Sequence, residues 1–180
     1  MKIIAIIPVR MASTRFPGKP LVDILGLFMV EHVRRRTELS SIIDEVIVAT
    51  CDQVIVEEVE KYGGKAVMTS DAHQRCTDRV AEAAATLEAD IIVNVQGDEP
   101  LISPYHIDQV IKFHKKNMNV DIVLPTLKIK LPDSPNIIKV VSNKKKEVLY
   151  LSRSKIPFEF KSKSNFYFKH LSIISFRPKA

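Results

Sequence analysis

The stretch that decides the fold is KIIAIIPVRMASTRFPGKP, residues 2–20. After Lys2 comes an unbroken apolar run, as expected for a parallel strand that is covered on both faces. The segment that follows, Val9–Lys19, cannot be helical because prolines flank and interrupt it. This segment carries Arg10, Arg15 and Lys19, so a buried strand leads directly into a cationic loop.

The rest of the chain alternates between short apolar strands and amphipathic helices. Strands are predicted for residues 45–50, 65–69, 90–95 and 121–129, and helices for residues 28–39, 52–62, 77–87 and 104–116. This order predicts an α/β fold with a doubly wound, largely parallel sheet and helices on both faces. Further on, the NKKKE stretch at residues 143–147 predicts a hairpin turn between two apolar strands. We interpret residues 1–180 as a single domain.

Composition narrows the class of protein. Hydrophobic residues make up 46% of the chain and charged residues 27%, as in an ordinary globular protein. The apolar run near the start is too short to span a membrane and no cleavage site follows it, so we expect a cytoplasmic protein without membrane contact. Cys51 and Cys76 form no CxxC motif, which fits a reduced compartment and argues against a cysteine zinc site.

Charge is unevenly distributed along the chain. Residues 1–127 contain 14 Lys and Arg against 18 Asp and Glu, whereas residues 128–180 contain 13 against 3. A basic segment can bind nucleic acid, but no motif of that kind accompanies this one, so we interpret it as a solvated surface and expect no nucleic-acid partner. The run Arg34, Arg35 and Arg36 is likewise interpreted as the solvated face of a helix.

Three loops are expected to meet at one edge of the sheet. Right-handed crossovers place every strand-to-helix loop at the same edge, where ligands of such folds bind. The loops are Val9–Lys19, Asp71–Arg79 and Gln96–Pro100. The first is cationic and the third acidic, a combination that suits a polyphosphate with a divalent metal ion.

The residue types in these loops indicate their roles. Arg10, Arg15 and Lys19 can neutralise phosphate oxygens, and Asp98 can hold Mg²⁺. The first loop is not a P-loop, because it lacks the GxxxxGK[ST] pattern. Charge at this site is therefore expected to come mainly from side chains.

Several stretches resemble those of the sugar cytidylyltransferases. They are IIPVRMASTRFPGKPLVDI at 6–24, the HQ..TDR pattern at 73–79, VNVQGDEPLI at 93–102, NIIKVV at 136–141, LYLSRSKIPF at 149–158 and KHLSI at 169–173. The set is most similar to the 3-deoxy-manno-octulosonate (Kdo) cytidylyltransferase family, the CMP-Kdo synthetases. The resemblance implies the Rossmann-like fold of nucleotide-diphospho-sugar transferases. It also implies conversion of CTP and Kdo to CMP-Kdo and pyrophosphate with Mg²⁺, for lipopolysaccharide biosynthesis, by a homodimer.

The resemblance also implies roles for single residues. Lys19, Arg15 and Asp98 would be catalytic, with Asp98 binding the metal ion. The triphosphate and the base would be bound by Arg10, Ser13, Gln74, Thr77 and Arg79, and the acidic sugar by Gln96, Arg153 and His170.

The chain also departs from the family pattern. Arg75 and Cys76 stand where the family has Ser-Gly, and Ile174 stands where it has a tyrosine. A side chain at Cys76 is expected to intrude on the nucleotide or to strain the backbone. Family members continue beyond residue 180 with a second metal-binding aspartate, so we expect the C-terminal part of the family domain to be missing here.

Activity is therefore left open between three alternatives. The first is a working Kdo cytidylyltransferase. The second is a non-catalytic, truncated or decayed paralogue that retains CTP binding. The third is a cytidylyltransferase for another 2-keto acid sugar, such as an acylneuraminate.

Overall fold

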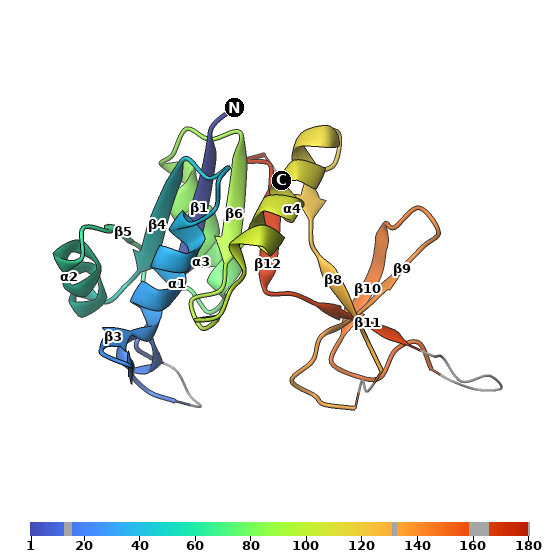
Figure 1. The fold of residues 1–180 in the computed structure, drawn as a ribbon, viewed down its shortest axis with the longest axis horizontal. Helices are drawn as coiled ribbons and strands as arrows, with labels where there is room; N and C mark the ends of the chain where they lie inside the picture. The colour runs from blue at the N-terminus through green and yellow to red at the C-terminus, as the bar shows by residue number, and fades with distance from the viewer. Residues whose placement is uncertain (13–15, 131–132, 159–165, 180) are drawn as a thin grey trace. The chain divides into compact units, whose positions relative to one another are not determined.

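The computed structural model describes residues 1–12, 16–130, 133–158 and 166–179, which belong to two compact units (Figure 1). Unit 1 comprises Met1–Val123 with Ser172–Ala180, and unit 2 comprises Leu124–Leu171. The single domain predicted over residues 1–180 stays a prediction, and within it the chain divides into these two units.

Unit 1 is built on a six-stranded sheet with the strand order β5-β4-β1-β6-β12-β7. The strands are β1 Ile3–Pro8, β4 Glu45–Thr50, β5 Lys65–Met68, β6 Ile91–Val95, β7 Ile122–Val123 and β12 Ile173–Phe176. The first four in the order are mutually parallel, and β12 runs antiparallel to both β6 and β7. All six residues of β1 are buried. The predicted α/β fold with a largely parallel sheet is confirmed.

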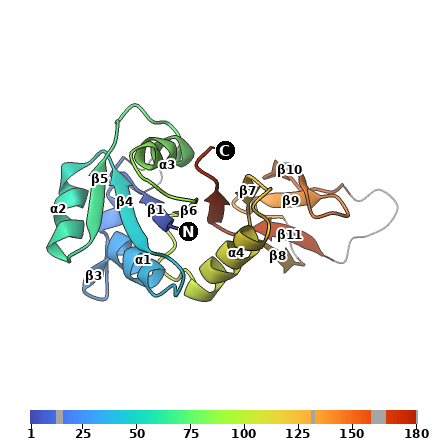
Figure 2. The ribbon, with the colours of Figure 1, turned by 90° about the horizontal axis from the view of Figure 1, so that it is seen from above.

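Helices cover both faces of this sheet (Figure 2). They are α1 Met29–Glu38, α2 Gln53–Lys61, α3 Cys76–Ala85 and α4 Pro104–Lys116. Apolar side chains of α1, α2 and α4 share one core cluster, whereas Val80 and Ala83 of α3 pack in a second cluster with Ile4 and Ile6. The α4 bounds agree with the sequence prediction to the residue, because Pro104 marks its first turn.

Smaller elements follow the first loop. A 3₁₀ helix, η1 Lys19–Leu21, leads into a short hairpin of β2 Asp23–Ile24 and β3 Leu27–Phe28. Among the described residues, no helix is both long enough and apolar enough to cross a bilayer.

The strand predicted over residues 121–129 is wrong. The chain leaves the unit 1 sheet after β7 and continues in unit 2 as β8, Thr126–Ile129. The break falls at Leu124 and Pro125, and proline cannot donate a hydrogen bond to a strand ladder. The pairing partner of β8 is therefore a different strand, β11 Tyr167–His170, in a separate sheet.

Unit 2 is an antiparallel sheet with the order β10-β9-β11-β8, in which β9 is Lys139–Ser142 and β10 is Val148–Ser152. The predicted hairpin turn between β9 and β10 is confirmed. The N–H of Asn143 donates to the carbonyl of Glu147 at 2.9 Å, and its side-chain oxygen accepts from the Glu147 N–H at 3.0 Å.

Lys139 is the buried polar anchor of unit 2, with only 1% of its surface exposed. Its Nζ donates to the carbonyls of Ser134 at 3.2 Å and Ile137 at 2.8 Å, and also to that of Arg153. Burying an ammonium group is costly unless its donors are satisfied, and here three carbonyls satisfy them. The side chain thus ties two loops to β9.

The arginine run of α1 is not a solvated face, so that prediction is wrong. Arg34 is 4% exposed and its Nε and Nη2 donate to Glu31 at 2.6 and 2.5 Å. The hydrogen bond with Glu31 raises the pKa of Arg34 above its usual value. Arg36 is half-buried and its Nε donates to the Ile102 carbonyl at 2.8 Å, so of the three only Arg35 is exposed.

Candidate active site

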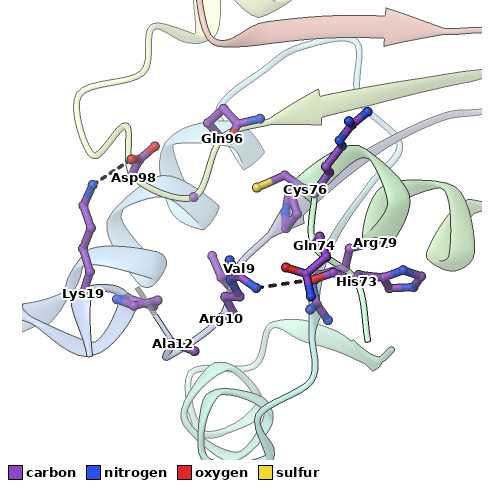
Figure 3. A pocket seen from close by; sticks show the side chains of 14 residues that line it. Val9, Arg10, Ala12, Lys19, His73, Gln74, Cys76, Arg79, Gln96 and Asp98 are labelled. Carbon is purple, nitrogen blue, oxygen red and sulfur yellow. Dashed lines mark hydrogen bonds and ion pairs between the residues drawn. The ribbon is translucent and has the colours of Figure 1, made fainter. Parts of the chain in front are cut away.

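The three loops predicted to converge line one pocket in unit 1, of about 240 Å³ (Figure 3). Each loop follows a strand of the parallel part of the sheet: β1, β5 or β6. The lining residues are Val9, Arg10, Ala12 and Lys19 from the first loop, with Pro8 before it and Pro20 after it, His73, Gln74, Arg75, Cys76 and Arg79 from the second, and Gln96, Gly97 and Asp98 from the third.

A glycine permits the first and third loops to approach each other. A Cβ atom at Gly97 would lie 2.1 Å from Cγ1 of Val9 and 3.1 Å from the carbonyl oxygen of Pro8. Real Cβ atoms do not come so close to a neighbour, so a side chain would push the loops apart. Gly97 therefore brings Asp98 beside the first loop.

Lys19 and Asp98 form an ion pair at the pocket wall, with 2.7 Å between Nζ and Oδ2 (Figure 3). The chain reaches Lys19 through Gly18, whose φ of +73° is a conformation that suits glycine, and whose N–H donates to the Met11 carbonyl. Both charged side chains remain partly exposed, at 29% and 46%. Such a pair contributes little to stability, but it keeps a cation and a carboxylate accessible to an incoming ligand.

The second loop contacts the first through its main chain. Nη1 of Arg10 donates to the carbonyl of His73 at 3.4 Å, while the His73 ring points away from Asp98 (Figure 3). The ring Nε2 instead lies 2.5 Å from Oε2 of Glu82 on α3. The same carboxylate accepts the N–H of Ser70 at 2.9 Å, and this bond, followed by the one with His73, lowers the pKa of Glu82.

Arg79 has structural partners as well as a place in the pocket. The residue is 3% exposed, Nη1 donates to Oγ1 of Thr69, and Nη2 lies 3.4 Å from Sγ of Cys51. Thr77, by contrast, is exposed in the first turn of α3 and is not among the lining residues. The predicted roles of both at the base stay predictions.

Of the two effects expected for a side chain at Cys76, intrusion on the nucleotide or strain of the backbone, the structure excludes the second. Arg75 has φ −116° and ψ 146°, ordinary extended values, and acts as the N-cap residue of α3, while Cys76 begins the helix. Glycine is not needed where the chain enters a helix in this way. Both residues line the pocket and Cys76 is exposed, and its intrusion on a bound nucleotide stays a prediction.

The remaining predicted site residues fall in different places. Ser13 and Arg15 lie outside the described residues. Gln96 lines the pocket of unit 1. Arg153 and His170 belong to unit 2, where Nη1 of Arg153 donates to the Pro135 carbonyl at 2.9 Å and the N–H of His170 donates to the Ile138 carbonyl.

The residues that support these loops by hydrogen bonds from outside the pocket were not identified from the sequence. Glu82 supports the second loop, and Oγ of Ser172 donates to Glu99 of the third loop at 2.8 Å. Glu82 has the spacing of an ordinary helix-surface glutamate, and Ser172 is distant in sequence from its partner. Neither carries a local signal that could have revealed its contact.

Metal donors are sparse in this site. Within the described ranges, no group of three or more His, Cys, Asp or Glu side chains is placed to hold a metal ion. Asp98 is the carboxylate that lines the pocket. A metal ion at this position would therefore depend on oxygen atoms of the ligand.

Comparisons with known proteins agree on one family. The sequence model for cytidylyltransferases matches residues 4–180. The 3-deoxy-manno-octulosonate cytidylyltransferase of Geotalea uraniireducens (strain Rf4) is 51% identical over 170 residues, covering 92% of this chain and 66% of the relative. That of Thermodesulfovibrio yellowstonii is 45% identical over 196 residues, covering 99% and 76%. The chain thus spans just under two thirds of the Geotalea protein's length.

A solved structure shares the fold closely. It is that of CMP:2-keto-3-deoxy-manno-octonic acid synthetase in complex with CTP, with a TM-score of 0.94 and 36% sequence identity. The similarity covers 99% of this chain and 75% of that one.

Proposed function

Because the chain belongs to the cytidylyltransferase family, as the resemblance predicted, we propose that it transfers CMP from CTP to the anomeric hydroxyl of Kdo. Pyrophosphate is the second product, and lipopolysaccharide biosynthesis is the process that the reaction serves. The observation that carries this proposal is the contact between Lys19 and Asp98 in a pocket lined by three strand-end loops. It brings together a cation of the kind that neutralises phosphate and a carboxylate of the kind that holds Mg²⁺.

The proposed reaction is an in-line displacement at the α-phosphorus of CTP. The anomeric oxygen bonds to phosphorus, the bond to the pyrophosphate oxygen breaks, and the hydroxyl proton passes to solvent. Such transfers need positioning and charge stabilisation more than covalent help. Lys19 stabilises the charge that develops at the α-phosphate. Arg10, together with Ser13 and Arg15, holds the triphosphate.

Ligand binding would exchange the partners of the ion pair. Lys19 leaves Asp98 for a phosphate oxygen, and Asp98 becomes available to Mg²⁺. One protein carboxylate together with phosphates and water is a usual environment for this ion, so the residues present fit it. Bound Mg²⁺ would neutralise phosphate charge and polarise the α-phosphate.

The remaining contacts are proposed by position. Gln74, with Thr77 and Arg79, would bind the base, and Gln96 of the third loop would face the sugar. The assignment of Arg153 and His170 to the sugar carboxylate rests on the family resemblance alone and stays a prediction.

A second candidate function is CTP binding without turnover. Arg75 and Cys76 favour it, because their side chains line the wall of the pocket where the family pattern has smaller residues. In this case the protein would bind CTP and release no pyrophosphate.

We further propose a cytoplasmic homodimer. Cys51 and Cys76 are free thiols, as is usual in a reduced compartment. In unit 2 the edge strand β10 leaves Leu149 and Tyr150 exposed at 64% and 62%. Exposed apolar edge strands tend to pair with another chain, and a second copy of this one is the proposed partner. Tyr150→Lys should then give a monomer in analytical ultracentrifugation.

A coupled pyrophosphate assay tests the catalytic proposal. The wild-type chain should release pyrophosphate with CTP, Kdo and Mg²⁺, and with Kdo faster than with N-acetylneuraminate. Lys19→Ala and Asp98→Asn should each lower the rate by about 10²–10³, as expected for lost transition-state contacts. Their melting temperatures should barely change, because the pair is partly exposed.

Lys61→Ala is the matched control, since Lys61 forms a surface ion pair with Glu58 on α2, away from the lining residues. It should leave the rate unchanged. CTP binding without pyrophosphate release would favour the second candidate. Full activity in Lys19→Ala would contradict the proposed site.

A further inference from the structure

We infer that Glu82 is a positioning residue, which holds the loop Ser70–Cys76 in the conformation that receives the nucleotide. The inference rests on the proposed function, because nucleotide affinity is one of its readouts. Glu82 does not line the pocket itself. It acts on the pocket through the loop that it anchors.

Glu82 fixes the loop at two points. Its Oε2 and Oε1 accept the N–H of Ser70 at 2.9 and 3.2 Å, and its Oε2 lies 2.5 Å from Nε2 of His73. Between these points, Oγ of Ser70 accepts the N–H of Ala72 at 3.2 Å. One carboxylate thus determines both where the loop starts and where it turns toward the pocket.

The anchored point lies directly before the residues that form the pocket wall. The carbonyl of His73 accepts from Arg10, and Gln74, Arg75 and Cys76 follow along the wall. Moving His73 would therefore displace a contact of the first loop and three lining residues together.

Packing cannot replace this anchor. In the loop Ser70–Cys76 no residue is buried, and His73 alone is half-buried. Loops without buried apolar side chains depend on their hydrogen bonds for a fixed conformation. A partly exposed contact of this kind contributes little to global stability, but here the same carboxylate binds main chain and side chain, so the expected effect is on loop geometry.

The charge of Glu82 matters for both contacts. The hydrogen bond from the Ser70 N–H, and then that with His73, lowers the pKa of Glu82, so the carboxylate is ionised at neutral pH. A glutamine could still accept the Ser70 N–H, but it could not bind the His73 ring with the same charge assistance. Glu82→Gln should therefore be milder than Glu82→Ala.

The test combines amide hydrogen exchange with calorimetry on the full chain. Without ligand, Glu82→Ala should speed exchange at residues 70–76 by about tenfold, since charge-assisted hydrogen bonds are lost. With CTP and Mg²⁺, it should weaken affinity by about tenfold, and Glu82→Gln should recover part of that loss. Glu88→Ala, an exposed glutamate just beyond the same helix, is the matched control and should change neither.

A double variant separates positioning from a general loss of stability. If Glu82 acts through the contact of His73 with Arg10, Glu82→Ala should cost much less affinity in an Arg10→Ala background than alone. Three results would each overturn the inference. They are unchanged exchange at residues 70–76 in Glu82→Ala, unchanged CTP affinity in Glu82→Ala, and a double variant whose loss of affinity equals the product of the losses in the two single variants. A wild-type chain that binds CTP but releases no pyrophosphate would refute the proposed catalysis only. Hydrogen exchange and CTP affinity of the Glu82 variants would still test the role of Glu82.

Discussion

The two units differ in how far their sheets are buried. In unit 1 all six residues of β1 are buried between helices, whereas in unit 2 four of the five residues of β10 are exposed. A parallel sheet covered on both faces carries its own core, while a small antiparallel sheet has little apolar surface to bury. We therefore expect unit 1 to hold its pocket by packing, and unit 2 to depend on particular polar contacts such as those of Lys139.

The largest effect should come from removing that polar contact in unit 2. Lys139→Met leaves three carbonyls without their donor and should cost about 3 kcal/mol or more, since each charge-assisted hydrogen bond contributes about 1.5–3 kcal/mol. Hydrogen exchange should rise in β9 and β11 but not in β1 or β6. Lys144→Met, in the exposed hairpin turn, is the control and should be neutral. An equal rise in both units would show that they do not differ as described.

In unit 1 the feature most sensitive to substitution is the close approach of the first loop to Gly97. Gly97→Ala places a Cβ atom 2.1 Å from Cγ1 of Val9 and should cost about 1–3 kcal/mol in urea unfolding. It should also weaken CTP binding, because Asp98 is displaced. Adding Val9→Ala makes room and should restore part of both losses. No rescue by the second substitution would mean that packing between the loops is not what positions Asp98.

A smaller effect, of opposite sign, is expected within the same sheet. Asn94 on β6 is 1% exposed, and within the described part of the chain neither atom of its amide has a hydrogen-bond partner. Replacing a buried unsatisfied amide with an apolar side chain of similar shape removes a desolvation cost, so Asn94→Leu should stabilise unit 1 by about 1 kcal/mol.

A paired substitution provides the comparison for Asn94. Ser175 on β12 is fully buried but satisfied, because its Oγ lies 2.8 Å from Nδ1 of His114. Ser175→Ala should therefore destabilise, by about 1 kcal/mol, where Asn94→Leu stabilises. Thermal unfolding of the two variants decides, and a loss of stability in Asn94→Leu would indicate that its amide has a structural role.

The same contrast explains how far the sequence could predict the fold. The parallel strands of unit 1 could be predicted because each is an apolar run bounded by proline, glycine or polar residues, and α4 because Pro104 marks its start. The border of unit 2 could not, because strand-forming residues continue on both sides of Pro125. Only the proline at position 125 indicates that these residues are divided between two sheets.

The site was predictable to the extent that it depends on strand ends. Lys19, Gln96 and Asp98 follow buried strands, and chain topology brings their loops together. The contact of Glu82 with His73 could not be read from spacing, since it depends on how an exposed loop folds back onto a helix. Burial of Arg34 was missed for a related reason: its acidic partner Glu31 lies on the same helix and enters the interior with it.

The central claim, that CTP occupies the pocket of unit 1, can be tested at Cys76. This thiol is exposed and lines the pocket, so a bound nucleotide should shield it from iodoacetamide. Peptide-resolved mass spectrometry should show alkylation of Cys76 slowing in proportion to occupancy by CTP and Mg²⁺. Lys19→Ala should lose most of this protection at the same CTP concentration. An unchanged alkylation rate at Cys76, at CTP concentrations that saturate binding by calorimetry, would contradict the account.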